Sequence, residues 1–134
     1  MIVGSIGYDD IETPIETGSD VLGGSAVHAG VSSSFHLPAT PEGIRRVGLV
    51  APIGRDFSNS HQSKLEDLGI DFSGVQKLPG KTFRWSGRYS GTMENVETIS
   101  TEVNVLGDFS PKIPESWRSP NVLFCANTHP ASQI

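Results

Sequence analysis

The sequence predicts an α/β fold in which helices alternate with the strands of a parallel sheet, together with a small antiparallel β flap. Short apolar runs are spaced along the chain, and segments with helical periodicity lie between them. Two later segments alternate apolar and polar residues with the period of a β-strand, which indicates the flap. The strands expected in the main sheet are Ile2–Tyr8, Arg46–Ile53 and Asn121–Asn127.

The first expected strand ends beside two acidic residues. Ile2–Tyr8 is short and apolar and contains two glycines, and Asp9 and Asp10 follow at its carboxyl end. Open α/β sheets bind their ligands at that end. The next segment, Ile11–Leu22, alternates loosely and is interrupted by Pro14, so we expect a strand or an extended arm there.

The first helix is expected to begin after Gly23-Gly24 and to stop at Pro38. Apolar residues recur every four positions in this segment, which predicts one buried helix face. That face would consist of Val27, Val31 and Phe35.

The second helix is expected after Arg46–Ile53, capped by Asp56 or Ser58 and running through Leu68. Gly69 favours a stop there, because glycine readily takes the left-handed conformation that ends helices. The predicted apolar side consists of Phe57, Leu65 and Leu68.

The flap is expected as a hairpin of two strands, Thr82–Ser90 and Val96–Val105, joined by a short turn. The period of two divides the first strand into an aromatic face and a polar face. The aromatic face carries Phe83, Trp85 and Tyr89, and the polar face carries Thr82, Arg84, Ser86 and Arg88.

Composition excludes several classes of protein and partner. The 134 residues predict one domain, and the longest apolar run, Val122–Ala126, is far too short to cross a membrane. The net charge is −5, and the leading third of the chain is acidic, which argues against nucleic acid and anionic membranes as partners. With one cysteine and no export signal, we expect a cytoplasmic protein. Cys125 is interpreted as an inert core thiol rather than a reactive one.

Three features stand out as candidate ligand contacts. Asp9 can accept hydrogen bonds from substrate hydroxyls, although it can equally be a turn or cap residue. Gly23-Gly24 would let a ligand approach the backbone at a helix N-terminus with free N–H groups, or would simply form a flexible turn. In the flap, Arg84 and Arg88 could cover an acidic or phosphorylated substrate, or could line a solvated strand face.

Generic catalytic patterns are absent from the sequence. No GxxxxGK[ST] phosphate loop occurs, the segment after Gly23 fails the GxSxG pattern, and the histidines lack zinc-ligand spacing. A dinucleotide-binding domain ranks last, because the first strand lacks the G-x-G-x-x-G order.

Taken in order, these segments resemble the N-terminal part of a PfkB (ribokinase-like) carbohydrate kinase. The resemblance covers roughly Ile2 to Gln133, and the order and spacing of its motifs make it more specific than any one of them. It implies a three-layer α/β/α fold with a small β lid. The matching segments are Gly4-Ser5-Ile6 with Asp9, Gly23 to Ala29, Arg46 to Val50, Ile53 to Phe57, Leu68 to Asp71 and Lys81 to Trp85.

The resemblance also implies roles for individual residues. Asp9, Gly23 and Gly24 match the residues that bind sugar hydroxyls in the family. His28 stands where the family usually has an asparagine that also touches the sugar, and an imidazole cannot reproduce an amide's paired donor and acceptor. Residues 11–22 and 82–105 correspond to the lid that closes over the sugar and often mediates dimers, so a homodimer through the lid is expected.

The family's catalytic aspartate and anion hole lie in a later GAGD-type motif, which this sequence lacks. We therefore expect residues 1–134 to be the substrate-binding part of a kinase that transfers phosphate from ATP, with Mg²⁺, to a carbohydrate hydroxyl. The chain alone is expected to bind neither ATP nor metal and to be inactive. The alternative is a non-catalytic sugar-binding or interaction module.

Overall fold

A five-stranded parallel sheet forms one part of the molecule in the computed structural model, which describes residues 1–133. The strand order is β5-β4-β1-β9, with β6 pairing to the carboxyl half of β4. Every residue of the central strand β4 is buried, as expected for a strand covered on both faces. The bounds are β1 Ile2–Val3, β4 Val47–Ile53, β5 Ile70–Asp71, β6 Val75–Lys77 and β9 Phe124–Cys125.

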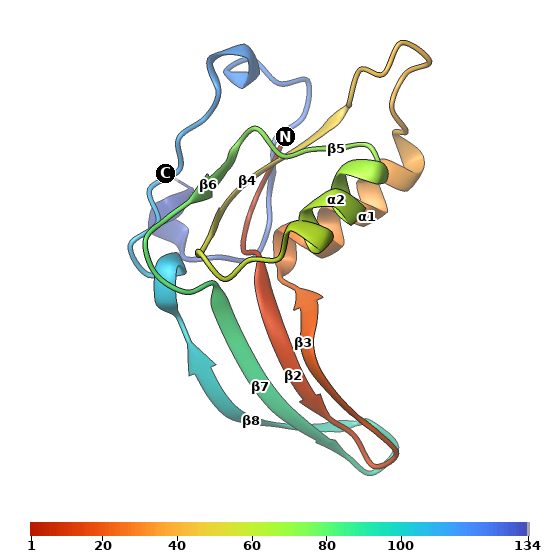
Figure 1. The fold of residues 1–134 in the computed structure, drawn as a ribbon, viewed down its shortest axis with the longest axis vertical. Helices are drawn as coiled ribbons and strands as arrows, with labels where there is room; N and C mark the ends of the chain where they lie inside the picture. The colour runs from red at the N-terminus through yellow and green to blue at the C-terminus, as the bar shows by residue number, and fades with distance from the viewer. Residues whose placement is uncertain (134) are drawn as a thin grey trace.

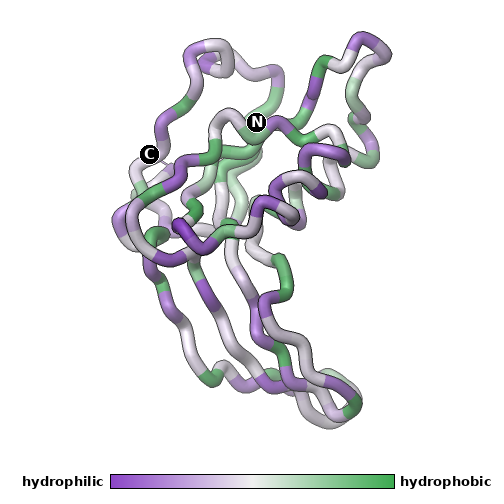
Figure 2. Tube along the Cα trace, viewed as in Figure 1, coloured by the Kyte–Doolittle hydropathy of each residue, from purple (hydrophilic) through white to green (hydrophobic). Residues whose placement is uncertain are grey.

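Two helices, α1 Ser25–His36 and α2 Asn59–Asp67, lie side by side against this sheet (Figure 1). The predicted helix boundaries are confirmed to within a residue or two. The Ser58 hydroxyl accepts the Ser60 N–H as an N-cap, and Gly69 follows α2 with a φ of +82°. Figure 2 shows hydrophobic stretches concentrated where the parallel strands run.

The predicted buried faces of the helices are partly wrong. Phe35 is 83% exposed, and Val31 and Leu68 also lie at the surface. Small residues face the sheet instead, because α1 approaches β4 so closely that a Cβ at Gly30 would lie 2.9 Å from the Leu49 side chain. The residues of α1 that are buried are Ala26, Val27, Gly30 and Ser34.

A second sheet of four strands extends from the carboxyl ends of the parallel strands (Figure 1), and we call it the lid sheet. Its order is β3-β2-β7-β8, in which β2 and β7 run parallel and the two outer pairs are antiparallel. The flap is therefore a mixed sheet, which the sequence did not indicate. The bounds are β2 Gly7–Glu12, β3 Thr17–Gly23, β7 Phe83–Ser90 and β8 Asn95–Glu102.

The prediction of one strand over Ile2–Tyr8 is wrong. The chain leaves the parallel sheet after Val3, crosses at residues 4–6 and enters the lid sheet as β2. At this crossing a Cβ at Gly4 would lie 2.7 Å from the Ser25 hydroxyl oxygen, so the close approach of α1 requires glycine. Asp9 and Asp10 consequently lie inside a lid strand rather than beyond the end of a buried one.

The expected last strand, Asn121–Asn127, is also different. Only Phe124–Cys125 pair with β1, at the edge of the sheet, and both residues are exposed. The interpretation of Cys125 as a core thiol is therefore wrong for this structure. The β8 strand ends at Glu102, before the predicted Val105, which is buried in a short 3-10 helix. The 3-10 helices are Asn104–Leu106, Glu115–Trp117 and Pro130–Ser132.

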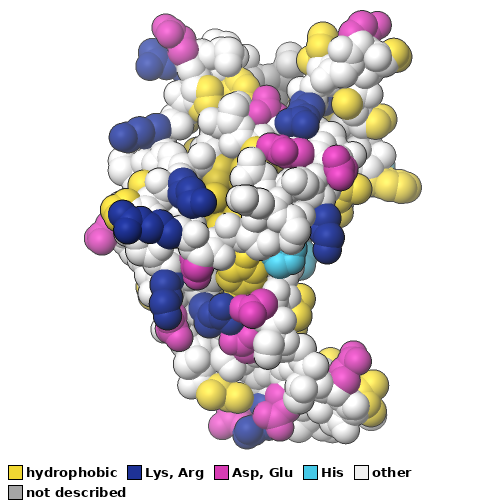
Figure 3. Space-filling model, in the orientation of Figure 1, with side chains coloured by type: hydrophobic (Ala, Val, Ile, Leu, Met, Phe, Trp, Pro, Cys, Tyr) yellow, Lys and Arg dark blue, Asp and Glu magenta, His cyan; other side chains and the backbone are white. Residues whose placement is uncertain are grey.

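Within residues 1–133 no helix has the length and apolar character needed to cross a membrane. On the face shown in Figure 3, Lys and Arg side chains lie interspersed with Asp and Glu rather than in one basic area.

The two leucines near the end of α2 test this packing. Leu65 is 2% exposed in the core, so Leu65→Ala is expected to lower the free energy of unfolding by about 2–4 kcal/mol. Leu68, predicted as buried but 49% exposed, provides the control, and Leu68→Ala is expected to cost less than about 1 kcal/mol. Urea unfolding followed by circular dichroism measures both, and equal losses would contradict the observed packing.

Candidate functional site

The junction between the lid sheet and the parallel sheet brings together three of the predicted site residues. Asp9 lies in the middle of β2, and the adjacent strand β3 ends at Gly23. A Cβ at position 23 would overlap the Asp9 carboxylate, so a side chain there would force the carboxylate out of its place against β3. Gly24 follows directly and leads into α1.

Gly24 lets the chain turn sharply into α1. Its φ is +100°, and a Cβ there would lie 2.5 Å from the carbonyl oxygen of Ser5. The prediction that the first N–H groups of α1 are free is wrong, since Ser25 N–H donates to Ser5 Oγ at 3.0 Å and Ala26 N–H donates to Ser5 O at 2.9 Å. The Ser25 hydroxyl donates to Asn127 O at 2.6 Å, which places the end of β9 beside the same junction.

Burial and a neighbouring histidine set the electrostatics of this junction. Burial raises the pKa of Asp9 above its usual value, whereas the charge of His28, in the first turn of α1, lowers it. His28 itself is exposed, so its ring can meet an incoming ligand. A partly buried carboxylate, a close-lying glycine backbone and an imidazole can together hydrogen-bond a ligand with several hydroxyls.

The two lid arginines do not lie with this group. Arg84 stands opposite Tyr8 in the register of β7 and β2 and is ion-paired to Asp10 at 2.8 Å and to Asp20. Arg88 is ion-paired to Glu12 at 2.9 Å, with Glu97 at 3.5 Å. Because neighbouring strand residues point to opposite faces, Asp10 and the arginine that binds it lie on the face opposite to Asp9.

That opposite face contains a cavity of about 380 Å³ between the lid sheet and the start of α2. The Tyr8 hydroxyl accepts the Ser58 N–H at 2.9 Å, and His61 Nδ1 lies 3.4 Å from it. The sequence did not predict this cluster of Tyr8, Ser58 and His61, because Tyr8 lies about fifty positions from the other two. The only local signal was the helix cap at Ser58. The cavity's lining residues are Tyr8, Asp20, Asp56, Ser58, His61 and Arg84.

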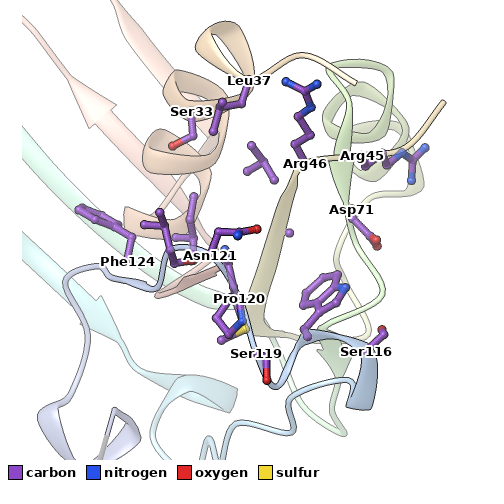
Figure 4. Close-up of a pocket in the computed structure, with 16 residues that line it drawn as sticks. Ser33, Leu37, Arg45, Arg46, Asp71, Ser116, Ser119, Pro120, Asn121 and Phe124 are labelled. Atoms are coloured by element: carbon purple, nitrogen blue, oxygen red, sulfur yellow. Dashed lines mark hydrogen bonds between the residues drawn. The ribbon is translucent and has the colours of Figure 1, made fainter. Parts of the chain in front are cut away.

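A larger cavity of about 600 Å³ lies at the other end of the parallel sheet, away from the lid (Figure 4). Residues from the end of α1, the start of β4 and the segment before β9 surround it, among them Leu37, Arg46 and Asn121. It contains none of the residues predicted to bind substrate. Over residues 1–133, no three His, Cys, Asp or Glu side chains gather as a metal site would require.

Comparison by sequence finds one similar protein of known activity. A cytidine kinase from Thermococcus kodakarensis is 37% identical over 82 residues, which cover 61% of this chain and 27% of the kinase. No protein-family model matches the chain.

Comparison by structure finds kinases of the ribokinase family. A nucleoside kinase from Methanocaldococcus jannaschii, described as an archaeal member of that family, aligns with 98% of this chain at a TM-score of 0.60 and 16% identity. A Burkholderia thailandensis nucleoside kinase in complex with inosine aligns with 80% of this chain at a TM-score of 0.56 and 16% identity. A Cryptococcus neoformans ribokinase in complex with ADP aligns with 92% of this chain at a TM-score of 0.55 and 17% identity. The aligned regions cover 46%, 37% and 39% of those chains, so this chain spans less than half of each.

These similarities confirm the fold class and the resemblance to ribokinase-like kinases. The chain has the fold of the N-terminal part of such a kinase, with its lid. The neighbours take small molecules such as inosine and ADP.

Two glycines with left-handed backbones test the tight turn before α1. Gly24→Ala is expected to lower the free energy of unfolding by about 2–4 kcal/mol, because the new Cβ adds a clash with Ser5 to the conformational cost. Gly43, with a φ of +82° and no atom within 4 Å of the place a Cβ would take, is the matched control, and Gly43→Ala is expected to cost about 1 kcal/mol. Chemical denaturation of both variants measures the difference, and equal costs would refute the close approach.

Proposed function

We propose that this chain is the acceptor-binding part and lid of a PfkB-type kinase that transfers phosphate from ATP to a carbohydrate hydroxyl, the ribose of a nucleoside being the first candidate. The observation that carries the proposal is the Asp9 carboxylate lying against Gly23 where the lid joins the parallel sheet. The similarity to a cytidine kinase supports a nucleoside as acceptor.

Each residue of the junction has a distinct task in this proposal. The Asp9 carboxylate accepts hydrogen bonds from two neighbouring hydroxyls of the sugar. Gly23 gives the Asp9 carboxylate room to lie against the backbone, and Gly24 lets the chain turn past Ser5, so the two glycines set the place of the carboxylate that meets the sugar. The exposed His28 donates one further hydrogen bond in place of the amide that the family usually has there.

ATP and Mg²⁺ binding are assigned to other parts of the full-length protein. Residues 1–133 contain no cluster of three His, Cys, Asp or Glu side chains that could hold a metal ion. The chain by itself is therefore proposed to bind acceptor without turning over ATP. Sugar-dependent ATP hydrolysis by residues 1–134 alone, followed in a coupled assay, would overturn this assignment.

An exposed apolar surface also supports the proposal that another part of the protein packs against this chain. Three large apolar side chains are exposed there: Phe35 on α1 (83%), Val122 just before β9 (69%) and Phe124 in β9 (52%). Large side chains on a sheet edge and the neighbouring helix usually mark a face that another part of the protein covers. We assign this cover to the remainder of the kinase domain. For the protein as a whole we infer a cytoplasmic location, where the exposed Cys125 stays reduced.

The lid is proposed to form a homodimer. Val96 and Ile99 on the outer strand β8 are 57% and 51% exposed, and this strand leaves one edge of the lid sheet unpaired. Sedimentation equilibrium of the full-length protein should show a dimer, and a double change to Val96→Lys and Ile99→Lys should shift it to a monomer. A wild-type monomer at micromolar concentration would contradict the proposal.

Substitutions in the junction test the acceptor site directly. In the full-length protein, Asp9→Ala is expected to weaken acceptor binding by about 100-fold or more, because it removes a charged hydrogen-bond acceptor. His28→Asn, which installs the family's amide, is expected to preserve or improve binding. Calorimetric titration with cytidine, inosine and ribose measures both. If the Asp9→Ala variant binds acceptor as tightly as wild type, the acceptor site lies elsewhere. If the wild-type protein binds acceptor but does not phosphorylate it, a non-catalytic binding module is favoured instead.

The pH dependence of binding follows from the raised pKa of Asp9. Binding requires the ionised carboxylate, so affinity should fall on acidification at a pH above the ordinary aspartate value of 3.8. The free energy of unfolding depends on pH in the opposite direction, because burial disfavours the charged form of Asp9. The stability that neutral Asp9 contributes is present at low pH and is lost as the pH rises through the raised pKa. In a His28→Asn background, which removes the titrating imidazole, Asp9→Asn should abolish this fall in affinity on acidification, as titrations between pH 4 and pH 8 would show.

A further inference from the structure

We propose that Arg84 is a positioning residue that holds the two lid strands carrying Asp9 and Gly23 in the spacing the acceptor site needs, rather than a residue that touches substrate. This inference rests on the proposed function for its kinetic consequences. The geometry behind it involves the face of the lid sheet opposite to Asp9.

The first observation is that the hydrogen-bonding capacity of Arg84 is directed at the lid itself. Nη1 donates to Asp10 Oδ2 at 2.8 Å, on the strand that carries Asp9, and Nη2 donates to Asp20 Oδ1, on the strand that ends at Gly23. These two acidic partners raise the pKa of Arg84, which stays charged at any working pH. One guanidinium on β7 thus joins β2 and β3, and its planar fork suits two carboxylates at once.

The second observation is that Arg84 stabilises an irregular segment of β3. The pairing of β2 and β3 shifts register between Asp9 and Ile11, which leaves Asp20 in an extra, bulged position. Asp20 has a φ of +55°, a left-handed conformation that is unfavourable for a residue with a side chain. Its N–H donates to Asp10 Oδ1 at 2.9 Å. Without the arginine, the carboxylates of Asp10 and Asp20 would repel each other at this bulge, only three residues before Gly23.

The third observation is that the same group is anchored to the helical layer. The guanidinium carbon of Arg84 lies 5.5 Å from the centroid of the Tyr8 ring, within the range of a cation–π contact. Tyr8 is 4% exposed, its ring stacks on Phe57 at 5.8 Å, and its hydroxyl accepts the Ser58 N–H at the start of α2. The bracket formed by Tyr8, Asp10, Asp20 and Arg84 therefore ties the position of β2 and β3 to the body of the molecule.

Arg88 provides a matched control on the same strand. It also lies on β7 and is also paired with acidic residues, Glu12 and Glu97, but it is 49% exposed and lies further along the lid. If Arg84 has a specific role, replacing it should affect acceptor binding more than replacing Arg88. If only the charge of the lid matters, the two replacements should have the same effect.

The test compares Arg84→Gln with Arg88→Gln in the full-length protein. Arg84→Gln should raise the KM for the acceptor by about tenfold or more, because small displacements of positioning groups are costly, and should leave the KM for ATP unchanged. In the absence of acceptor, the amides of residues 21–25 should exchange with deuterium faster in Arg84→Gln than in wild type. Arg88→Gln should change neither quantity.

Several outcomes would overturn the proposal. Unchanged amide exchange with a raised acceptor KM would show that Arg84 contacts substrate directly. Equal effects of the two variants would show that only lid charge matters. If the wild-type protein phosphorylates no acceptor, the proposed function fails, and the exchange comparison still decides the role of the bracket. Should Arg84→Gln not fold, Arg84→Lys keeps the charge without the fork and should show the same effects at reduced size.

Discussion

The crossing of the chain from the parallel sheet to the lid sheet is the constraint on which the rest of the structure depends. At this point Ser5 and Ser25 exchange hydrogen bonds, with each backbone N–H donating to the other residue's hydroxyl at 3.0 Å. The exchange joins the segment between β1 and β2 to the start of α1. Because Asp9 lies four residues after Ser5, and Gly24 lies directly before Ser25, the same contact places both parts of the candidate site.

The two faces of β2 have separate tasks as a consequence. One face presents Asp9 to the junction, where burial raises its pKa and its carboxylate occupies the space that a side chain at Gly23 would take. The other face, through Tyr8 and Asp10, is fully engaged with Arg84 and the start of α2. Directly neighbouring residues of one strand therefore carry the group proposed to bind substrate and the groups proposed to hold it in place.

The proposed function assigns to this chain only the contacts to the acceptor. The regions that align with this chain make up less than half of two nucleoside kinases of similar fold. A phosphoryl-transfer site needs groups that neutralise the charge of the transferring phosphate as well as groups that position the acceptor. In the proposed function the junction of Asp9, Gly23, Gly24 and His28 positions the acceptor.

Much of the local structure could be predicted from the sequence, because local signals decide it. Ser58 caps α2 and Gly69 ends it as expected, and the alternation in Thr82–Ser90 correctly indicated a strand. Asp9, Gly23 and Gly24 were singled out from their order and spacing, and the structure brings them together. Where local signals were weak the predictions failed, as at Ile2–Tyr8, where apolar residues continue through a crossing that only the packing of α1 reveals.

The sequence by itself thus determined the helix ends and the strand that became β4, since each depends on residues close together in the chain. The resemblance to ribokinase-like kinases supplied the candidate acceptor contacts Asp9, Gly23 and Gly24. Only the tertiary structure decided which face of a helix is buried, whether Cys125 is covered and what Arg84 binds. These properties depend on which distant segments meet. Asp10, Asp20 and Tyr8 reach Arg84 only because β7 pairs in parallel with β2, a pairing between segments more than seventy residues apart that no local pattern records.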